Sequence, residues 1–287
     1  MSATEETNAA ATPVVDDAND LRGFHFKRLM KKRLTLILTA AFVIAAGVAG
    51  ALFVAVAVGG LAAIGVLLLA IVIVFFIADS KSEDAFFEAY AKQRGLTLGG
   101  RTSLPAATPL LCKGDDRYAQ RTLTGPLAEG IDGTLALYTY EEETTDSKGN
   151  RQTSYYHYTV TLVDIPECVS FVPELYCQQK FGFKFLEKFE DVFRGSKERV
   201  KFESEQLDDR YEIFTHEDQD ENWLRQLFSP TFIVWLTDSA PKKFGFELVE
   251  GTLCCFVNSH KDHSAELDEI SAATAGVVAR LREESLE

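Results

Sequence analysis

The longest apolar stretch in the chain runs from Leu34 to Ala78 and contains 45 residues without one charged side chain. At about 1.5 Å per residue, one helix of this length would reach roughly 67 Å, more than twice the roughly 30 Å hydrocarbon layer of a bilayer. Residues 34–78 are therefore predicted to form a transmembrane helical hairpin. Its turn is placed at Gly59 and Gly60, because two glycines can leave helical geometry at little steric cost. The alternative is that both glycines pack inside a longer helix.

The segment 21–33, just before this stretch, is basic and predicts the orientation of the hairpin. Positive side chains beside a membrane span are retained in the cytoplasm, and two crossings return the chain to the same side. The sequence thus predicts a multi-pass protein of the cell inner membrane with both termini in the cytoplasm. A cleaved signal peptide competes with this interpretation, but its apolar region is normally about 7 to 15 residues long. The topology residues are Arg22, Lys27, Arg28, Lys31, Lys32 and Arg33.

Residues 79–95 have the spacing of an amphipathic linker helix between membrane and domain. Phe86, Phe87 and Tyr90 fall on its apolar side, and Gly95 is a good stop.

Strand-like alternation follows an irregular stretch, residues 96–125, that is rich in Gly, Thr and Pro. Residues 133–142 and 152–164 alternate between apolar and polar on either side of the turn 146–150, which predicts a hairpin of two long strands. In the second strand, one face carries Tyr156, Tyr158, Val160 and Leu162. The more polar face is expected to be solvated or lightly covered and carries Tyr155, His157, Thr159 and Thr161.

The rest of the chain mixes helical and strand periods. Asp218 with Glu221 is typical of a helix start, as is Ser229 followed by Pro230. The fold class predicted is α+β. The membrane hairpin is followed by a cytoplasmic domain over 96–287, which contains antiparallel hairpins and a carboxy-terminal helix. As an alternative, this domain divides into two halves, 96–180 and 181–287. The elements expected are a helix bearing Phe185, Phe189, Val192 and Phe193, strands at 200–203 and 210–214, a hairpin of 244–249 with 252–257, and a final helix from Ser264.

Charge and cysteine content narrow the class of protein. Residues 1–20 are small, polar and acidic, and we expect a disordered tail. After residue 33 the chain carries 23 basic and 38 acidic side chains, an excess of 15 negative charges that is the wrong sign for nucleic-acid binding. The five cysteines are odd in number and lack a C-x-x-C pair, which favours reduced thiols in the cytoplasm.

Three segments between residues 196 and 258 carry a family resemblance. They read F-E-S-E-Q-L-D-D-R-Y-E-I-F, then L-F-S-P-T-F-I-V-W-L, then F-G-F-E-L-V-E-G-T-L-C-C-F-V. In this order they resemble the bacterial family catalogued as domain of unknown function 3137. The resemblance implies an amino-terminal membrane hairpin followed by a cytoplasmic α+β domain, and it implies no catalytic positions.

Motifs that carry chemistry are sparse. No phosphate-binding loop, dinucleotide fingerprint, nucleophile elbow or zinc spacing occurs in the sequence. Asp218, Asp220 and Asn222 begin like a calcium loop, but Trp223 stands where the turn requires Gly, so acids at a helix start explain them better. His260 and His263 are the candidates if a metal binds, yet the sequence supplies no further ligand. We therefore expect no cofactor, no metal and no catalytic residue.

The strands on either side of the turn 146–150 are rich in tyrosine. Aromatic side chains with polar ends on an exposed sheet suit contacts with a partner, while two ordinary strands with one buried face would use tyrosine as readily. The candidate partner surface comprises Tyr138, Tyr140, Tyr156 and Tyr158.

These observations favour a membrane-anchored cytoplasmic interaction or scaffold module. Its expected partners are the lipid bilayer and another protein, with a homo-oligomer as a further option. A second hypothesis is a membrane-tethered hydrolase, which would have to bring together distant groups such as His157, Cys177, Asp209 and His216. A third is a subunit of a small oligomeric channel or transporter, which is disfavoured because the apolar stretch has no ionisable residue.

Overall fold

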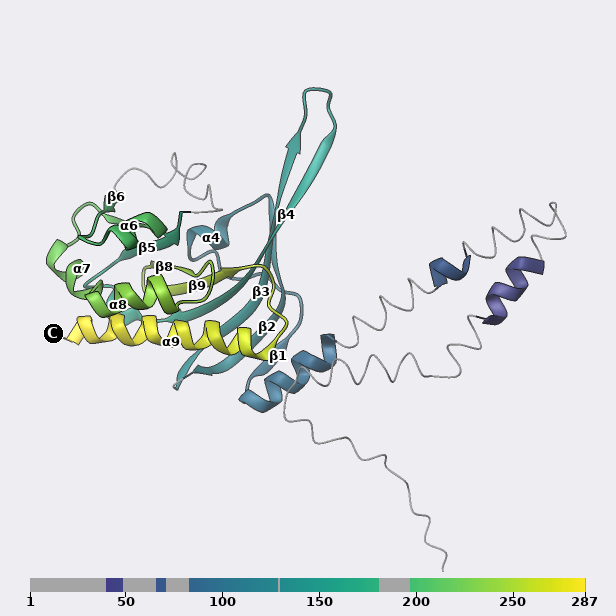
Figure 1. The fold of residues 1–287 in the computed structure, drawn as a ribbon, viewed down its shortest axis with the longest axis horizontal. Helices are drawn as coiled ribbons and strands as arrows, with labels where there is room; N and C mark the ends of the chain where they lie inside the picture. The colour runs from purple at the N-terminus through teal and green to yellow at the C-terminus, as the bar shows by residue number, and fades with distance from the viewer. Residues whose placement is uncertain (1–39, 49–65, 71–82, 129, 181–196, 287) are drawn as a thin grey trace, which may run out of the picture. The chain divides into compact units, whose positions relative to one another are not determined.

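The computed structural model describes residues 40–48, 66–70, 83–128, 130–180 and 197–286 (Figure 1). They belong to two compact units, Met1–Tyr90 and Ala91–Glu287. The acidic segment 1–20, the basic segment 21–33 and the predicted turn at Gly59 and Gly60 lie outside the described residues.

In the first unit, residues 40–48 and 66–70 are helical, and both ranges fall within the predicted hairpin. Large apolar side chains on them are exposed, with Phe42 62% and Leu69 60% accessible. Among the described residues, no helix is both long and apolar enough to cross a bilayer. The hairpin therefore stays a prediction. Residues 83–94 form a further helix, which begins in the first unit, continues past Tyr90 into the second and ends at Gly95 with a φ of 68°.

The second unit is built on a nine-stranded sheet, counted over its described residues, in the order β1-β2-β3-β4-β9-β8-β5-β7-β6. Every neighbouring pair of strands is antiparallel. The α+β class with a large antiparallel sheet is thus confirmed. The strands are β1 (Thr97–Gly99), β2 (Asp116–Ala128), β3 (Ile131–Thr145), β4 (Arg151–Asp164), β5 (Glu174–Gln179), β6 (Lys197–Val200), β7 (Tyr211–His216), β8 (Gly245–Val249) and β9 (Thr252–Asn258).

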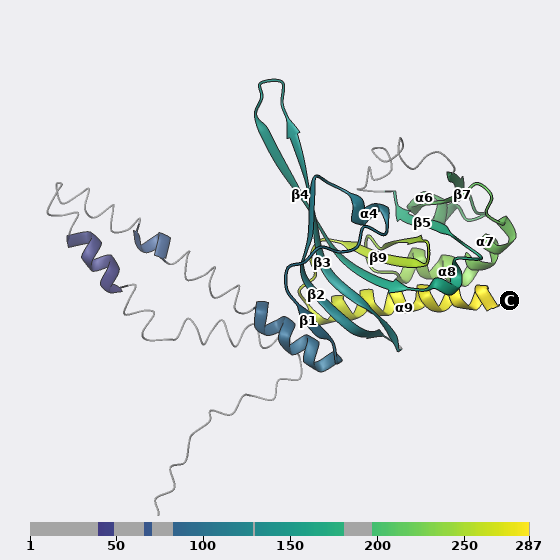
Figure 2. The same cartoon turned by 180° about the vertical axis from the view of Figure 1, so that it is seen from behind.

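Short helices connect the strands and one long helix ends the chain. The predicted carboxy-terminal helix is confirmed and runs along the sheet (Figures 1 and 2). The helices are α4 (Pro109–Cys112), η1 (Pro166–Cys168), α6 (Glu205–Arg210), α7 (Glu221–Leu227), α8 (Pro230–Val234), the π-helical turn η3 (Trp235–Ser239) and α9 (Ser264–Leu286).

One face of the sheet is covered by α4 and holds an aromatic core. Because side chains alternate along a strand, the even-numbered residues of β3 and β4 share this face. Their tyrosines pack with Phe256 of β9 and with Leu110 and Leu111 of α4. The rings of Tyr158 and Phe256 meet edge to face with centroids 6.2 Å apart.

The opposite face is covered by α9, which contacts β2, β4 and β9. This is the polar face of β4, which was expected to be solvated or lightly covered; that holds for Tyr155 and His157, which are exposed, but was wrong for Thr159 and Thr161. Thr159 and Thr161 are completely buried, because their hydroxyls are satisfied inside the protein. Thr161 Oγ1 lies 2.5 Å from Thr274 Oγ1 on α9, and Thr159 Oγ1 donates to the carbonyl of Ser259 at 3.0 Å.

Several local predictions differ from the structure. The stretch expected to be irregular, residues 96–125, includes β1 and most of the 13-residue strand β2. Residues after Val200 do not continue a strand, because Ser204 caps α6 by accepting a hydrogen bond from the amide of Leu207 at 3.3 Å. The cap of α7 is Asp220, whose Oδ1 accepts from the amide of Asn222 at 2.8 Å, and not Asp218. The helix-start role thus belongs to Asp220, whereas Asp218 Oδ2 lies 3.8 Å from His216 Nδ1.

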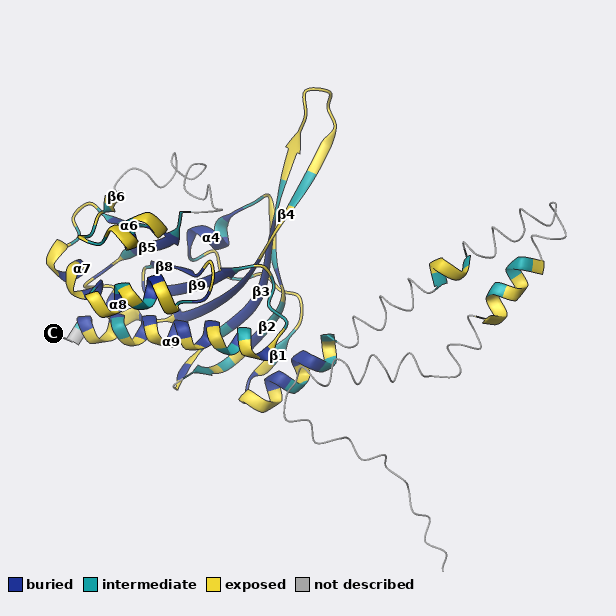
Figure 3. Ribbon diagram, viewed as in Figure 1, coloured by how far each residue is buried: buried dark blue, intermediate teal, exposed yellow. Residues whose placement is uncertain are grey.

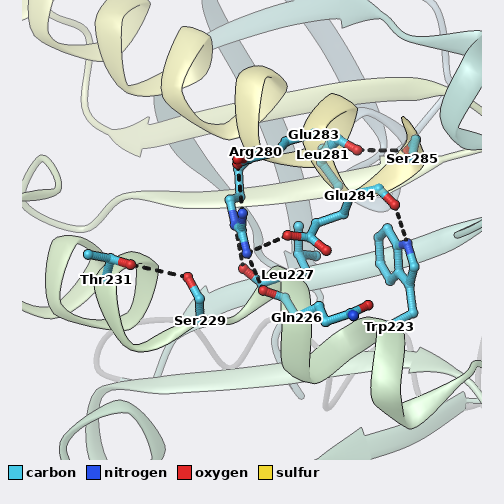
Figure 4. A network of polar contacts seen from close by, with 10 residues as sticks. All are labelled: Trp223, Gln226, Leu227, Ser229, Thr231, Arg280, Leu281, Glu283, Glu284 and Ser285. Atoms are coloured by element: carbon cyan, nitrogen blue, oxygen red, sulfur yellow. Dashed lines mark hydrogen bonds and ion pairs between the residues drawn. The ribbon is translucent and has the colours of Figure 1, made fainter. Parts of the chain in front are cut away.

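A partly buried arginine, Arg280, connects α7 to α9 (Figure 4). Arg280 Nε donates to the carbonyl of Leu227 at 3.1 Å, and a second guanidinium nitrogen donates to the carbonyl of Gln226. The same guanidinium forms an ion pair of 2.5 Å with Glu284, whose side chain is only 6% exposed. Trp223 Nε1 donates to the carbonyl of Glu284 at 3.1 Å. The last carbonyls of α7 are thereby satisfied by a cation, as a helix carboxy-terminus requires.

Candidate interaction surface

Strands β3 and β4 extend beyond their neighbours as a two-stranded arm, residues 142–156. Pairing with β2 ends at Glu141, which lies opposite Asp116, and pairing with β9 ends at Tyr158, which lies opposite Asn258. The arm rises from the sheet in Figures 1 and 2, and Figure 3 shows that most of it is exposed. A two-stranded ribbon is marginally stable alone, so its length calls for a functional explanation.

The tip of the arm is held by one aspartate. Asp146 Oδ1 accepts hydrogen bonds from the amides of Lys148 and Asn150, each at 2.8 Å, and Oδ2 accepts from the side chain of Asn150 at 2.9 Å. The Asn150 side-chain bond, followed by these backbone bonds, lowers the pKa of Asp146. Gly149 with a φ of 82° completes the turn. The arm therefore has a defined tip of the kind that Asx turns build.

Carboxylates gather where the arm leaves the sheet. Asp115 Oδ2 accepts from the amide of Glu143 at 2.7 Å, which joins the loop before β2 to the arm. Acidic side chains along an exposed edge also prevent indiscriminate strand pairing. The acidic residues at this root are Asp115, Asp116, Glu141, Glu142 and Glu143.

The structure divides the tyrosines that were predicted to form a partner surface. Tyr138, Tyr140 and Tyr158 are at most 3% exposed and belong to the core under α4. Burial raises the pKa of all three phenols well above the usual range. Tyr156 is 38% exposed and stacks on Tyr140 with centroids 4.8 Å apart. Of the four, only Tyr156 is placed to meet a partner.

Two tyrosines that sequence reasoning missed lie on the other face at the arm root. Tyr155 is 56% exposed and lies opposite Glu141 across the β3–β4 ladder. The second tyrosine is Tyr118, whose ring centroid lies 3.7 Å from the guanidinium carbon of Arg101. Partial burial, and then the nearby carboxylate of Glu141, raises the pKa of Tyr118, while Arg101 opposes this. The arm root thus presents aromatic rings beside charges of both signs, a composition common in protein interfaces.

The two candidate metal-binding histidines do not converge. His260 faces the sheet, where its Nε2 lies 3.0 Å from the carbonyl of Tyr138 and 3.2 Å from Thr139 Oγ1. Burial lowers its pKa. His263 instead contacts Asp262, with Nδ1 2.8 Å from Oδ1, and its distance to a Glu266 oxygen is 3.6 Å.

Asp262, His263 and Glu266 form a cluster whose ligand atoms lie within 4.8 Å of one another, at the start of α9. The ammonium group of Lys261 binds Glu266 at 2.8 Å. His263 is exposed and the other two residues are half-buried. Because a lysine already neutralises one carboxylate, these contacts are explained as charge pairing at a helix start.

A carboxyl group, that of Glu247, is buried in the sheet. Glu247 on β8 is 3% exposed, and its Oε2 accepts from the amide of Leu110 in α4 at 2.9 Å. Burial raises the pKa of Glu247 to about 7; the Leu110 amide and the more distant Lys113 and Lys197 oppose the shift. The buried hydroxyl of Thr108 has no hydrogen-bond partner in the described residues, although it lies close enough to this carboxyl to favour its ionised form.

The groups proposed for a hydrolase are not brought together. In the described part of the chain, no hydrogen bond or ion pair joins any two of His157, Cys177, Asp209 and His216. Cys177 is completely buried, and burial raises the pKa of its thiol well above the usual range.

The five cysteines are free. Cys254 and Cys255 are completely buried on opposite faces of β9, since Cys254 lies opposite Leu162 and Cys255 opposite Thr161. Burial raises the pKa of Cys255 to about 12 and that of Cys254 well above its usual range. Such thiols are poor nucleophiles.

Comparison with known proteins does not assign the chain to a family. No family model and no curated protein matches the chain. A solved structure with some likeness is that of the mycobacterial trehalose monomycolate transport factor A, TtfA, with a TM-score of 0.41 and 10% identity. The match covers 69% of this chain and 89% of that one. A likeness of this degree carries no argument about fold or function, and the family resemblance over 196–258 stays a prediction.

Proposed function

We propose that this chain is a membrane-anchored interaction module whose α+β domain faces the cytoplasm and binds a partner protein through the β3–β4 arm. The arm carries this proposal. It projects beyond the paired part of the sheet, its tip is fixed by Asp146, and its root exposes Tyr155 and Tyr156. An element that contributes no core and yet has a defined shape is suited to recognition.

The anchor is supported by sequence. The 45 apolar residues from Leu34 to Ala78 follow a basic flank, which favours a two-span hairpin with both ends in the cytoplasm. A module tethered in this way meets its partners at the membrane surface, where tethering raises their effective concentration.

The arm root also favours a class of partner. Five carboxylates cluster there, on a part of the chain that is acidic as a whole. A basic protein surface complements this charge and would be steered toward it, with exposed tyrosines supplying contact area. We therefore expect a partner rich in Lys and Arg at its contact surface, with an association rate that falls as salt increases.

The test is affinity capture of the full chain from its own membranes in mild detergent, followed by mass spectrometry. The wild-type chain is compared with a Glu142→Lys, Glu143→Lys double variant. A matched control carries Glu217→Lys and Glu269→Lys, which change the charge equally at exposed positions away from the arm. The proposal predicts proteins that are captured by the wild type and the control and are lost with the arm variant. Equal capture by all three chains would contradict it.

A further inference from the structure

The backbone of β4 has one side that faces away from β3 along the whole arm. Where β9 still accompanies β4, the amide of Ser259 donates to the carbonyl of His157 on this side at 2.8 Å. Backbone groups point alternately to the two sides of a strand, and the β3–β4 register has no shift over its length. The amides and carbonyls of Arg151, Thr153 and Tyr155 therefore point to the same side. We call this row of backbone groups the β4 edge.

The β4 edge is open. Pairing with β9 ends at Tyr158, and in the described part of the chain no hydrogen bond reaches the edge amides and carbonyls of Arg151, Thr153 and Tyr155. The outer part of the arm also stands clear of the other described elements in both views (Figures 1 and 2). Each of these three residues offers one donor and one acceptor. Another extended backbone is the ligand that complements such a row.

The opposite edge of the arm, on β3, is protected against strand addition. The outward amide of Glu143 donates to Asp115 Oδ2 at 2.7 Å, and residues 141–143 are three consecutive glutamates. Charged side chains on an edge prevent pairing with another strand. Residues 152–156 of β4 are instead Gln, Thr, Ser, Tyr and Tyr, which are uncharged at neutral pH and include strong strand formers. The β4 edge is thus the side of the arm that is suited to pairing.

The two faces beside the β4 edge differ in chemistry. Glu143 lies opposite Thr153, so their side chains share a face. A strand added to β4 would lie about 10 Å from β3, and a long basic side chain on it can cross the short Thr153 toward the Glu143 carboxylate. Arg151 competes only weakly, because it lies 3.9 Å from Glu143 and its side chain is 79% exposed. The other face presents the ring of Tyr156, which is 38% exposed.

We propose that the β4 edge receives an extended segment of a partner protein as an additional strand. The basic side chains of this segment face Glu141 and Glu143, and its apolar side chains face Tyr156. Strand addition rests on the proposed role of the arm and adds the mode of binding to it. Backbone hydrogen bonds supply affinity, and the alternation of basic and apolar side chains supplies selectivity.

Two proline substitutions separate the two edges of the arm. Thr153→Pro removes an amide from the β4 edge. Thr145→Pro is the matched control, because it removes an outward amide from β3, on the side where Glu141 accepts from the amide of Asp115. Neither amide belongs to the β3–β4 ladder, and proline is tolerated at such edge positions. Each full-length variant, kept in a neutral detergent, must unfold at the temperature of the wild type before it is compared.

The probe is an acetylated, fluorescent decapeptide in which Lys and Val alternate, and its affinity is measured by fluorescence anisotropy. A second peptide has the same sequence with every backbone amide N-methylated, so it keeps the charges and cannot donate. We expect the first peptide to bind Thr153→Pro at least about tenfold more weakly than the wild type, the equivalent of one good hydrogen bond. Thr145→Pro should match the wild type. The methylated peptide should bind the wild type at least about tenfold more weakly than the first peptide.

Equal binding of the first peptide by all three chains, equal binding of both peptides by the wild type, or no binding would overturn strand addition. These outcomes leave open a partner held by side chains alone, so they are distinct from failure of the proposed function, which is equal capture by the chains with altered arm charge. A dimer of the wild-type chain that Thr153→Pro abolishes would assign the β4 edge to a second copy and would also overturn the proposal.

Discussion

The carboxylate of Glu247 and the amide of Leu110 form a hydrogen bond of 2.9 Å between β8 and α4, residues separated by 137 positions in the chain. The hydrogen bond holds α4, the helix that covers the aromatic core, against β8. The bond also places an ionisable group where water does not reach, and this has consequences for stability.

Stability should fall as the pH rises from about 4.5 to about 7. Burial raises the folded-state pKa of Glu247 from 4.5 to about 7, so the folded protein favours the protonated carboxyl. The stabilisation is complete below the unfolded pKa and is lost as pH rises through the folded one. The shift corresponds to at most about 3 kcal/mol.

Glu247→Gln isolates this contribution, because the amide oxygen can still accept from Leu110 and has no charge to bury. The free energy of unfolding is measured with denaturant at pH 5 and pH 8 for both chains. We expect the variant to gain stability relative to the wild type at pH 8. The same difference at both pH values would contradict a titrating Glu247.

Removing Arg280 should destabilise the domain by about 3 kcal/mol. The substitution Arg280→Ala leaves the buried Glu284 carboxylate and the last carbonyls of α7 without their cation. Arg282→Ala is the matched control, since its ion pair with Glu167 is half-exposed on both sides and should cost less than about 1 kcal/mol. Chemical unfolding of the two variants provides the comparison, and equal losses would show that the Arg280 network is not important for stability.

Shortening the arm should leave the domain nearly as stable as before. Replacing residues 143–153 by Asn-Gly joins Glu142 to Ser154, which lie opposite each other, through a two-residue turn. The exposed arm adds little burial, so we expect a change below about 1 kcal/mol in the free energy of unfolding. A large loss would mean that the arm supports the fold and is not free to serve recognition.

Native thiol labelling should modify one cysteine per chain. Cys112 is partly exposed, whereas Cys168, Cys177, Cys254 and Cys255 are buried. Mass spectrometry after brief maleimide treatment is expected to show one adduct in buffer and five in denaturant. Rapid labelling of Cys254 or Cys255 in buffer would reveal an accessible thiol where the structure places the core.

The sequence predicts the strong local patterns of this domain well. The turn at Glu250 and Gly251 is present, with φ angles of 47° and 82°, and Ser229 followed by Pro230 starts α8. Both signals depend on conformations that neighbouring residues dictate. In contrast, β2 contains Gly125 and Pro126, which weaken its strand pattern; its long ladder with β3 overrides them.

The candidate surface was harder to predict from the sequence, because the burial of a residue depends on elements that are distant in the chain. Nothing near Tyr138 or Tyr158 in the chain indicates that α4 covers them, and nothing near Thr161 indicates that α9 does. The alternation assigned each residue to a face correctly. It could not show which face would be covered, and the arm emerges only because β2 and β9 stop pairing near Glu141 and Tyr158.

The central claim, a domain held on the cytoplasmic side of a membrane with its arm free, is tested most directly at the arm tip. Lys148→Cys places a thiol on an exposed turn of the full chain. Cells expressing it are treated with a membrane-impermeant maleimide before and after permeabilisation, and the tip peptide is analysed by mass spectrometry. The account predicts labelling only after permeabilisation. Labelling of this cysteine in intact cells would contradict it.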